Sequence, residues 1–186
     1  MVSNKFEVND EIVAIQYTKM QIAKVQIESA IEMLFEGHHP VSVHTVGQAG
    51  FQIVRDIARV KNLDVLMKIE RADNKFWRKA NYAWSFCKHA LHDSEDIFPG
   101  FKQELNELSL FWAIHLYSHL GGKVTAAMAA LSSLVMTKYP EMWNYSNPNV
   151  TSEMIEASKG LTRAEFLEVG RQMIALARVK PAYAEN

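Results

Sequence analysis

The amino-acid sequence predicts an all-α fold, an irregular bundle of about seven helices in one domain that spans residues 1–186. Apolar side chains recur every three to four residues, the spacing that places them on one face of a helix. No strand-like alternation persists beyond the first fifteen residues, and no internal repeat occurs. Hydrophobic residues make up 48% of the chain and charged residues 22%, a balance typical of a protein with a packed core.

The first helix is predicted from about Thr18 to Phe35. Its apolar residues share one face, and Gly37 follows where a glycine commonly ends a helix. Residues 6–17 are compatible with two readings, an extended arm or an early start to this helix. On the first of these interpretations, residues 1–15 form an extended N-terminal arm.

A second helix is expected from about Val43 to Val60, with Ser42 as its N-cap after Pro40 has interrupted the chain. Gly47 and Gly50 lie one turn apart within it. Glycine lowers helix propensity, but it lets a neighbouring helix approach closely. The pair therefore predicts a tight helix contact.

The remaining helices follow from the same periodicity and from turn residues between them. They are expected at about 64–71, 74–89, 103–120 and 124–138, in a short segment that ends at Gly160, and from Thr162 to the residues before Pro181. Thr162 and Glu165 fit a capping box at the start of the last helix. Residues 92–101 form the most loop-like interior segment.

Charge and hydropathy exclude several classes of protein. The formal net charge is −1, whereas most proteins that bind duplex DNA carry a basic excess. The N-terminus lacks the pattern of a secretion signal. The longest apolar stretch, residues 108–136, is interrupted by polar residues and a glycine pair, and each half is too short to span a bilayer. We expect a soluble, cytoplasmic protein that binds neither membranes nor duplex DNA.

The sequence also lacks the commonest enzyme signatures. It has no phosphate-binding glycine loop, no Gly-x-Ser-x-Gly, no His-Glu-x-x-His and no calcium-binding loop. Cys87 is the single cysteine, which excludes an internal disulfide and a zinc site built from several cysteines. Common nucleotide-binding, hydrolase and metalloprotease functions are therefore not indicated.

The end of the helix predicted at 74–89 carries a candidate catalytic set: Lys88, His89 and Asp93, with His92 as a binding residue beside them. Histidine can move a proton at neutral pH, an ammonium group can stabilise a phosphate oxygen, and a carboxylate can orient the imidazole. The alternative is structural, because cations at a helix C-terminus also stabilise the helix dipole.

His44 and Asp56 are further candidate binding residues. His44 is expected in the first turn of its helix, where the dipole disfavours a positive charge, so it should be neutral. We predict that His44 faces Lys88 and His89 across a shared cleft.

His115 and His119 lie four residues apart on one predicted helix, a spacing that suits two ligands of one divalent transition metal. Glu107 lies about 12 Å away along the same helix, so a third ligand must come from another helix. The alternative is that both histidines lie at the edge of a core helix. No cofactor is expected unless this site holds a metal.

Two segments of the chain resemble a family of small uncharacterised bacterial proteins. Residues 40–49, Pro-Val-Ser-Val-His-Thr-Val-Gly-Gln-Ala, and then Ile-Val-Arg-Asp at 53–56, are similar to that family's Pro-Val-Ser-x-His-Thr-Leu and Ile-Leu-x-Asp. Residues 86–93 are similar to its Asn-Phe-Phe-Lys-His-Ala-x-x-Asp, with Ser85 in place of the asparagine and Cys87 in place of the second phenylalanine. The resemblance singles out His44, Asp56 and the Lys88–Asp93 segment without giving any of them a role.

The predicted bundle is also similar to HEPN-type helical ribonucleases, but only at the level of the fold. Their Arg and His are separated by four to six residues, and no pair in this chain has that spacing. Fold alone does not give function.

The sequence leaves three functions open. The first is a non-catalytic helical binding or regulatory module that forms a homo-oligomer, because no complete catalytic set can be assembled. The second is an acid–base enzyme that cleaves RNA or another phosphate ester with Lys88 and His89, while Asp93 orients the imidazole. The third is a metal protein that uses His115 and His119.

Overall fold

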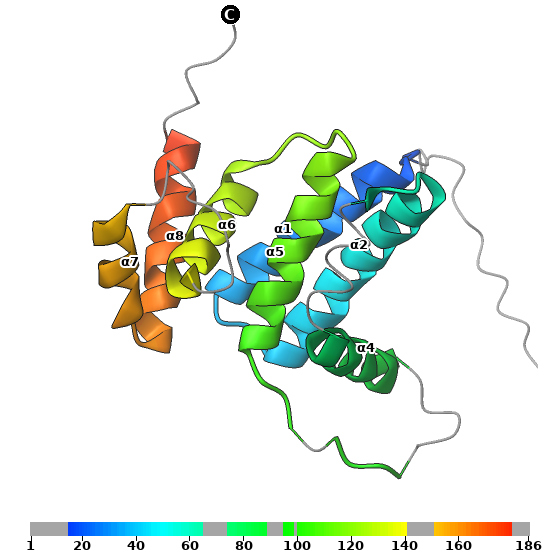
Figure 1. Ribbon diagram of the computed structural model, residues 1–186, viewed down its shortest axis with the longest axis horizontal. Coiled ribbons are helices and arrows are strands. Elements are labelled where there is room, and N and C mark those ends of the chain that lie inside the picture. The colour runs from blue at the N-terminus through cyan, green and yellow to red at the C-terminus, as the bar shows by residue number, and fades with distance from the viewer. Residues whose placement is uncertain (1–14, 65–73, 89–94, 99, 141–150, 180–186) are drawn as a thin grey trace, which may run out of the picture.

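The computed structural model confirms the all-α prediction (Figure 1). It describes residues 15–64, 74–88, 95–98, 100–140 and 151–179. Within these ranges the chain forms seven helices and no strand: α1 Lys19–Phe35, α2 Pro40–Val60, α4 Asn74–Lys88, α5 Glu104–His119, α6 Ala126–Lys138, α7 Ser152–Lys159 and α8 Arg163–Val179. The predicted helix at 64–71, apart from Asp64, the arm at 1–15, apart from Ile15, and the stop at Pro181 lie outside the described residues.

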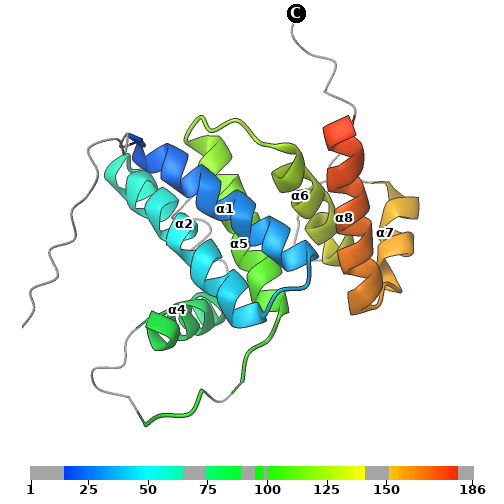
Figure 2. The ribbon, with the colours of Figure 1, turned by 180° about the vertical axis from the view of Figure 1, so that it is seen from behind.

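Helices α1, α2 and α5 form the centre of the bundle (Figures 1 and 2). Helices α6, α7 and α8 group at one end of the molecule, and α4 packs against α2 at the other. None of the described helices combines the length and apolar character that a membrane span requires.

The two glycines of α2 produce the close helix contact that the sequence predicts. A Cβ atom at Gly50 would lie 3.0 Å from Cγ1 of Ile27 and 3.1 Å from the carbonyl oxygen of Ala23 on α1. A Cβ atom at Gly47 would lie 3.0 Å from Cδ2 of Leu110 on α5. Since Gly50 meets the first half of α1, the end of α2 lies beside the start of α1.

The predicted start of the second helix was wrong by three residues. Pro40 opens α2 instead of interrupting the chain, and His39 rather than Ser42 is the N-cap. The His39 imidazole accepts a hydrogen bond through Nδ1 from the amide of Val41 at 3.3 Å. Proline suits the first helical position because its φ is already helical and its missing amide hydrogen has no helical partner there.

Capping boxes open α1 and α8, and the box of α8 was predicted. Thr18 accepts a bond from the amide of Gln21, whose side chain accepts one from the Thr18 amide, so the two form a capping box. Thr162 and Glu165 form the predicted box at the start of α8. Helices whose ends are set by such local bonds begin within one or two residues of the prediction.

The C-terminal helix packs onto the end of α1 through an aromatic side chain. Phe35 stands so close to α8 that a Cβ atom at Gly170 would lie 2.0 Å from its ring. Its ring centroid is 6.0 Å from that of Phe166, and its carbonyl accepts a 2.6 Å bond from Nη1 of Arg171. These contacts fix α8 against the central helices.

Candidate functional site

His44 lies in a buried polar cluster between three helices. Its side chain, in the second turn of α2, is 1% exposed. Nδ1 is 3.0 Å from Oδ1 of Asn106 on α5, and Nε2 is 3.4 Å from the carbonyl oxygen of Ala80 on α4. Nδ2 of Asn106 in turn donates to the carbonyl of Pro40 at 2.8 Å. The cluster therefore joins the start of α2 to α5 and α4.

The pKa of His44 is lowered from its ordinary value by burial, although the bonds to Asn106 and Ala80 act in the opposite direction. The imidazole is therefore neutral at neutral pH, as predicted. The predicted cause was wrong, because His44 lies one turn deeper in α2 than expected and burial has the largest effect.

Aromatic rings cover His44 on the side of α4. The edge of the imidazole meets Phe101 at a centroid distance of 5.0 Å. Phe101 contacts Phe98, and Phe98 contacts Phe86 and the exposed ring of Tyr82. A row of aromatic contacts thus leads from the surface to the buried histidine.

Lys88, the last residue of α4, is exposed, and its Nζ lies 4.7 Å from the ring centroid of Trp84. It follows Ala80, which contacts His44, by eight residues, or roughly 12 Å along the helix axis. His89, His92 and Asp93 lie outside the described residues. Their assignment as a catalytic and binding set, and the shared cleft with His44, therefore stay predictions.

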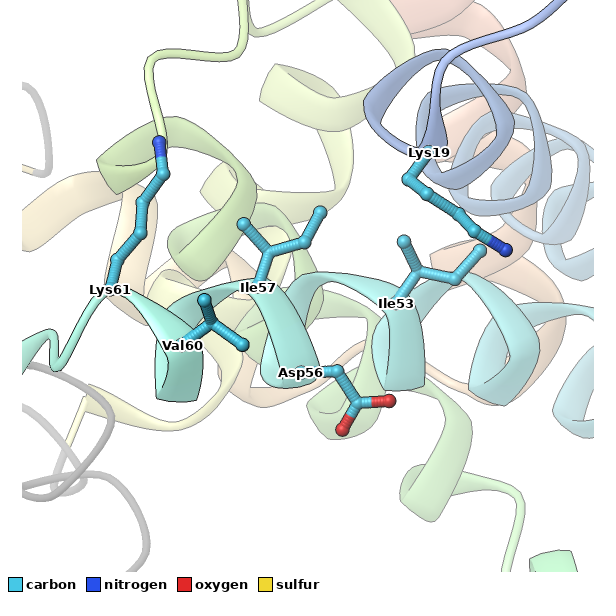
Figure 3. A pocket seen from close by; sticks show the side chains of 6 residues that line it. All are labelled: Lys19, Ile53, Asp56, Ile57, Val60 and Lys61. Atoms are coloured by element: carbon cyan, nitrogen blue, oxygen red, sulfur yellow. The ribbon is translucent and has the colours of Figure 1, made fainter.

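Asp56 lines an open pocket of about 290 Å³ between the end of α2 and the start of α1 (Figure 3). Ile53 and Ile57 form its apolar floor, and Lys19 and Lys61 stand at its rim. The Asp56 carboxylate accepts bonds from Gln52 at 2.7 Å and Arg59 at 3.4 Å, both through Oδ1.

His115 and His119 lie together near the end of α5, with ring centroids 4.3 Å apart. Nδ1 of His119 is 2.9 Å from the carbonyl oxygen of His115, and the ring of His115 stacks on Phe111. Burial and the neighbouring His119 lower the pKa of His115. Among the described residues no third His, Cys, Asp or Glu joins the pair in a group that could hold a metal. The two histidines could supply two ligands of a site.

Sequence reasoning missed a second buried polar cluster, centred on Glu107 of α5. The fully buried carboxylate accepts bonds from Lys138 of α6 at 2.9 Å, from the hydroxyl of Tyr139 at 3.1 Å and from Arg163 of α8. Burial and Glu107 raise the pKa of Tyr139, so its hydroxyl remains protonated and donates. The signal in the sequence was a carboxylate on the face of α5 that also carries Leu110 and Phe111.

The geometry thus brings His44 together with Asn106, and Asp56 lines one pocket with Lys19 and Lys61. Lys88, His115 and His119 join neither group. Comparisons with protein-family models, curated proteins and solved structures found no match. The resemblance to the bacterial family and the analogy with HEPN-type ribonucleases therefore stay predictions.

Proposed function

We propose that this protein is a non-catalytic binding module that pairs with a second copy of itself. The surface that forms the pair, named the α1–α2 end surface, lies where the start of α1 meets the end of α2 (Figures 1 and 3). Its pocket is lined by apolar Ile53, Ile57 and Val60 and by charged Lys19, Asp56 and Lys61. We include the exposed Ile15 and Tyr17, which precede the first residue of α1 by four and two positions.

The observation that carries the proposal is the exposure of apolar side chains at this end of the molecule. Val60 is 83% exposed, Ile15 is 71% exposed and Tyr17 is 55% exposed. Ile53 and Ile57 line the adjacent pocket (Figure 3). Apolar residues grouped in this way, with charged residues around them, are typical of an association surface because contact removes them from water.

Charge complementarity favours a second copy as the occupant. A two-fold pair places the same surface of each copy on the other, so a residue that contacts a partner residue is contacted by its own counterpart. The rim of the pocket carries the acidic Asp56 and the basic Lys19 and Lys61. A two-fold pair can therefore set the carboxylate of each copy beside a lysine of the other. The formal net charge of −1 adds little repulsion between copies.

The polar groups inside the described bundle support a non-catalytic role. His44 and Asn106 bond to each other beneath aromatic rings, and Glu107 is enclosed by two cations and a hydroxyl. Groups bound in this way hold helices together. The alternative of RNA cleavage by Lys88, His89 and Asp93 rests on the sequence, and the metal alternative rests on His115 and His119.

Sedimentation velocity on the full chain tests the proposal. The wild type is expected to be dimeric at micromolar concentration, and Val60→Glu is expected to be monomeric because it buries an unpaired charge in the contact. Leu176→Glu is the matched control, since Leu176 of α8 is also exposed, at 64%, but lies elsewhere. It should remain dimeric. A monomeric wild type, or a Val60→Glu protein that still pairs, would contradict the proposal.

A charge exchange tests the ionic part of the contact. Asp56→Lys should weaken the pair because it makes the rim wholly basic, and the double change Asp56→Lys with Lys61→Asp should restore it. Equal dissociation constants for the wild type and both variants would remove the charge argument, and the apolar contact would have to explain the pairing without it.

A further inference from the structure

We infer that this protein also binds a small organic anion, an acid group on a short apolar body, in a pocket at the opposite ends of α1 and α2 from the α1–α2 end surface. The pocket, named the α2–α5–α8 pocket, has a volume of about 340 Å³. The first turns of α2, α5 and α8 and the end of α1 line it. Pockets of this size commonly hold small ligands.

Arg163 supplies the fixed positive charge of the α2–α5–α8 pocket. A guanidinium group has five N–H donors. Nη1 donates to Glu107, while Nε is buried and has no hydrogen-bond partner among the described residues. Nε itself has no accessible surface, but the Arg163 side chain is 33% exposed and lines the pocket. The exposed part of the guanidinium can donate to an acceptor carried by a ligand.

The charge of Arg163 is not cancelled by its partner. The single carboxylate of Glu107 binds both Arg163 and Lys138, whose side chains are 33% and 24% exposed, so Glu107 alone does not neutralise the two cations. Glu104 acts on the same cluster, since its charge contributes to the raised pKa of Tyr139. Lys138 is not among the residues that line the pocket, whereas Arg163 lines it. Arg163 is therefore the cation that this pocket presents to a ligand.

Further donors surround Arg163. His38, His39 and Gln103 line the same pocket and are exposed. Nδ1 of His39 accepts the bond that caps α2, so Nε2 of His39 carries the ring proton and can donate to a ligand. The N–H at Nε2 of His38 donates to Oε2 of Glu36 at 3.0 Å, so His38 offers no second N–H as a neutral ring. Gln103 is the N-cap residue of α5, but its side chain makes no capping bond. The pocket thus offers side-chain donors from three elements.

The helix dipoles act in the same direction. The α2–α5–α8 pocket lies at the N-terminal ends of α2, α5 and α8, which meet at the lower end of the molecule in Figure 1. The N-terminal end of a helix carries a partial positive charge. Three such ends reinforce the preference for an anion that Arg163 establishes.

The remaining wall determines what the anion is attached to. Pro40 and Leu167, which are partly exposed, give the α2–α5–α8 pocket an apolar side, with the buried Leu34 and Val43 beside them. An inorganic ion would leave this side in contact with water, whereas a short alkyl or aryl group would cover it. The ligand class is therefore an amphipathic acid, a carboxylate or a phosphate monoester.

Isothermal titration calorimetry on the full chain tests the site with three probes: hexanoate, hexyl phosphate and hexanol. Saturable binding of either acid, with binding of hexanol at least about tenfold weaker, is expected because only the acids engage Arg163. The tighter of the two acids identifies the acid group. Hexanol that binds as tightly as both acids, or acids that do not bind at all, would overturn the inference.

Gln103→Glu places a negative charge in the α2–α5–α8 pocket without removing a described hydrogen bond, and it should weaken acid binding about tenfold or more. Gln103→Asn is one control, because it keeps the amide. Leu176→Glu is the other, because it adds the same charge about 20 Å from Arg163 along α8. The dissociation constant of each control for the acids should lie within about twofold of the wild-type value. Circular dichroism confirms that each variant is folded. Unchanged affinity in Gln103→Glu, or equal weakening by Leu176→Glu, contradicts the site. Because Gln103 is not part of the α1–α2 end surface and Val60 does not line the α2–α5–α8 pocket, dimerisation and acid binding are tested by different variants and succeed or fail independently.

Discussion

Asn106 and Glu107 are consecutive buried residues of α5. Asn106 attaches α5 to one part of the bundle by neutral hydrogen bonds, and Glu107 attaches it to another part by ion pairs. Asn106 bonds to neutral groups, His44 and the Pro40 carbonyl, on the side of α2. Glu107 bonds to the cations of Lys138 and Arg163 on the side of α6 and α8. Successive helical residues point about 100° apart, which places the two side chains against different neighbours.

The difference shows how burial changes the cost of losing one partner. Removing one partner of a neutral hydrogen bond leaves the other polar group without a partner. Removing the charge of Glu107 leaves two cations without their counter-charge, which costs more free energy. The Glu107 cluster should therefore be the more sensitive of the two to substitution. The Asn106 cluster, which contains a histidine, should be the more sensitive to acid.

The largest effect is expected from Glu107→Gln. The amide has nearly the shape of the carboxylate, but it leaves Lys138 and Arg163 without a counter-charge, and we expect a loss of about 3–5 kcal/mol in the free energy of unfolding. Urea denaturation measures it. Glu168→Gln, which changes an exposed carboxylate on α8, is the matched control and should have little effect. A loss below about 1 kcal/mol for Glu107→Gln would show that the cluster stabilises the protein no more than an ordinary ion pair on the surface does.

A smaller effect is expected from Asn106→Ala. It removes the bonds to His44 and the Pro40 carbonyl and leaves both without these partners, so the free energy of unfolding should fall by about 1–3 kcal/mol. Gln172→Ala is the control, because it removes an amide whose bond to Glu168 lies on the surface. Urea denaturation of Asn106→Ala beside Glu107→Gln ranks the clusters directly. The reverse order would show that the neutral cluster is the more important one.

The pH dependence of stability should distinguish the clusters further. The pKa of His44 is lowered in the folded protein, so the unfolded chain binds the proton more readily. Stability is fully present above the unfolded pKa of about 6.5, and it is lost as the pH falls through that value towards the lower folded pKa. We expect a decrease of about 1 kcal/mol between about pH 7.5 and about pH 5.5, measured by urea denaturation.

His44→Gln should remove part of that decrease, and His115→Gln should remove another part, because burial lowers the pKa of His115 as well. His38→Gln is a control at an exposed histidine on the surface. If the free energy of unfolding depends on pH in the same way in wild type, His44→Gln and His115→Gln, other groups are responsible for the decrease.

The smallest effect is expected from an exposed ion pair. Nζ of Lys24 lies 3.8 Å from Oε2 of Glu28 one turn later in α1. Lys24→Met should change the free energy of unfolding by less than about 0.5 kcal/mol, because water screens both charges. A change as large as that of Glu107→Gln would show that proximity rather than burial determines the strength of ion pairs in this protein.

The sequence predicted the helices better than the contacts between them. Thr18 and Thr162 cap helices through bonds to residues three positions away, so a pattern in the sequence is enough to place them. The start of α2 was misplaced because Pro40 was interpreted as a break, although proline is also favoured as a first helical residue. The contact of Gly47 and Gly50 with neighbouring helices was predicted correctly, because two glycines one turn apart lower helix propensity and are tolerated where another helix packs closely.

The site was predicted less well, for a physical reason. Glu107 and Arg163 are 56 positions apart, and His44 and Asn106 are 62 apart. No periodicity connects such residues, since their meeting depends on how the helices pack. The sequence could show that Glu107 shares a face with apolar residues, but not which cations it would meet.

The contact between Phe35 and α8 has a consequence for the order in which the chain folds. Helices α1, α2 and α5 can pack once residue 119 has been made, but the ring and carbonyl of Phe35 stay uncovered until Gly170 and Arg171 emerge. Those contacts join Phe35 to residues 135 and 136 positions later, so they can form only after nearly the whole chain has been made. Until then, a nascent chain presents a bare phenylalanine at the end of its first helix, which is the kind of surface that chaperones and neighbouring nascent chains bind.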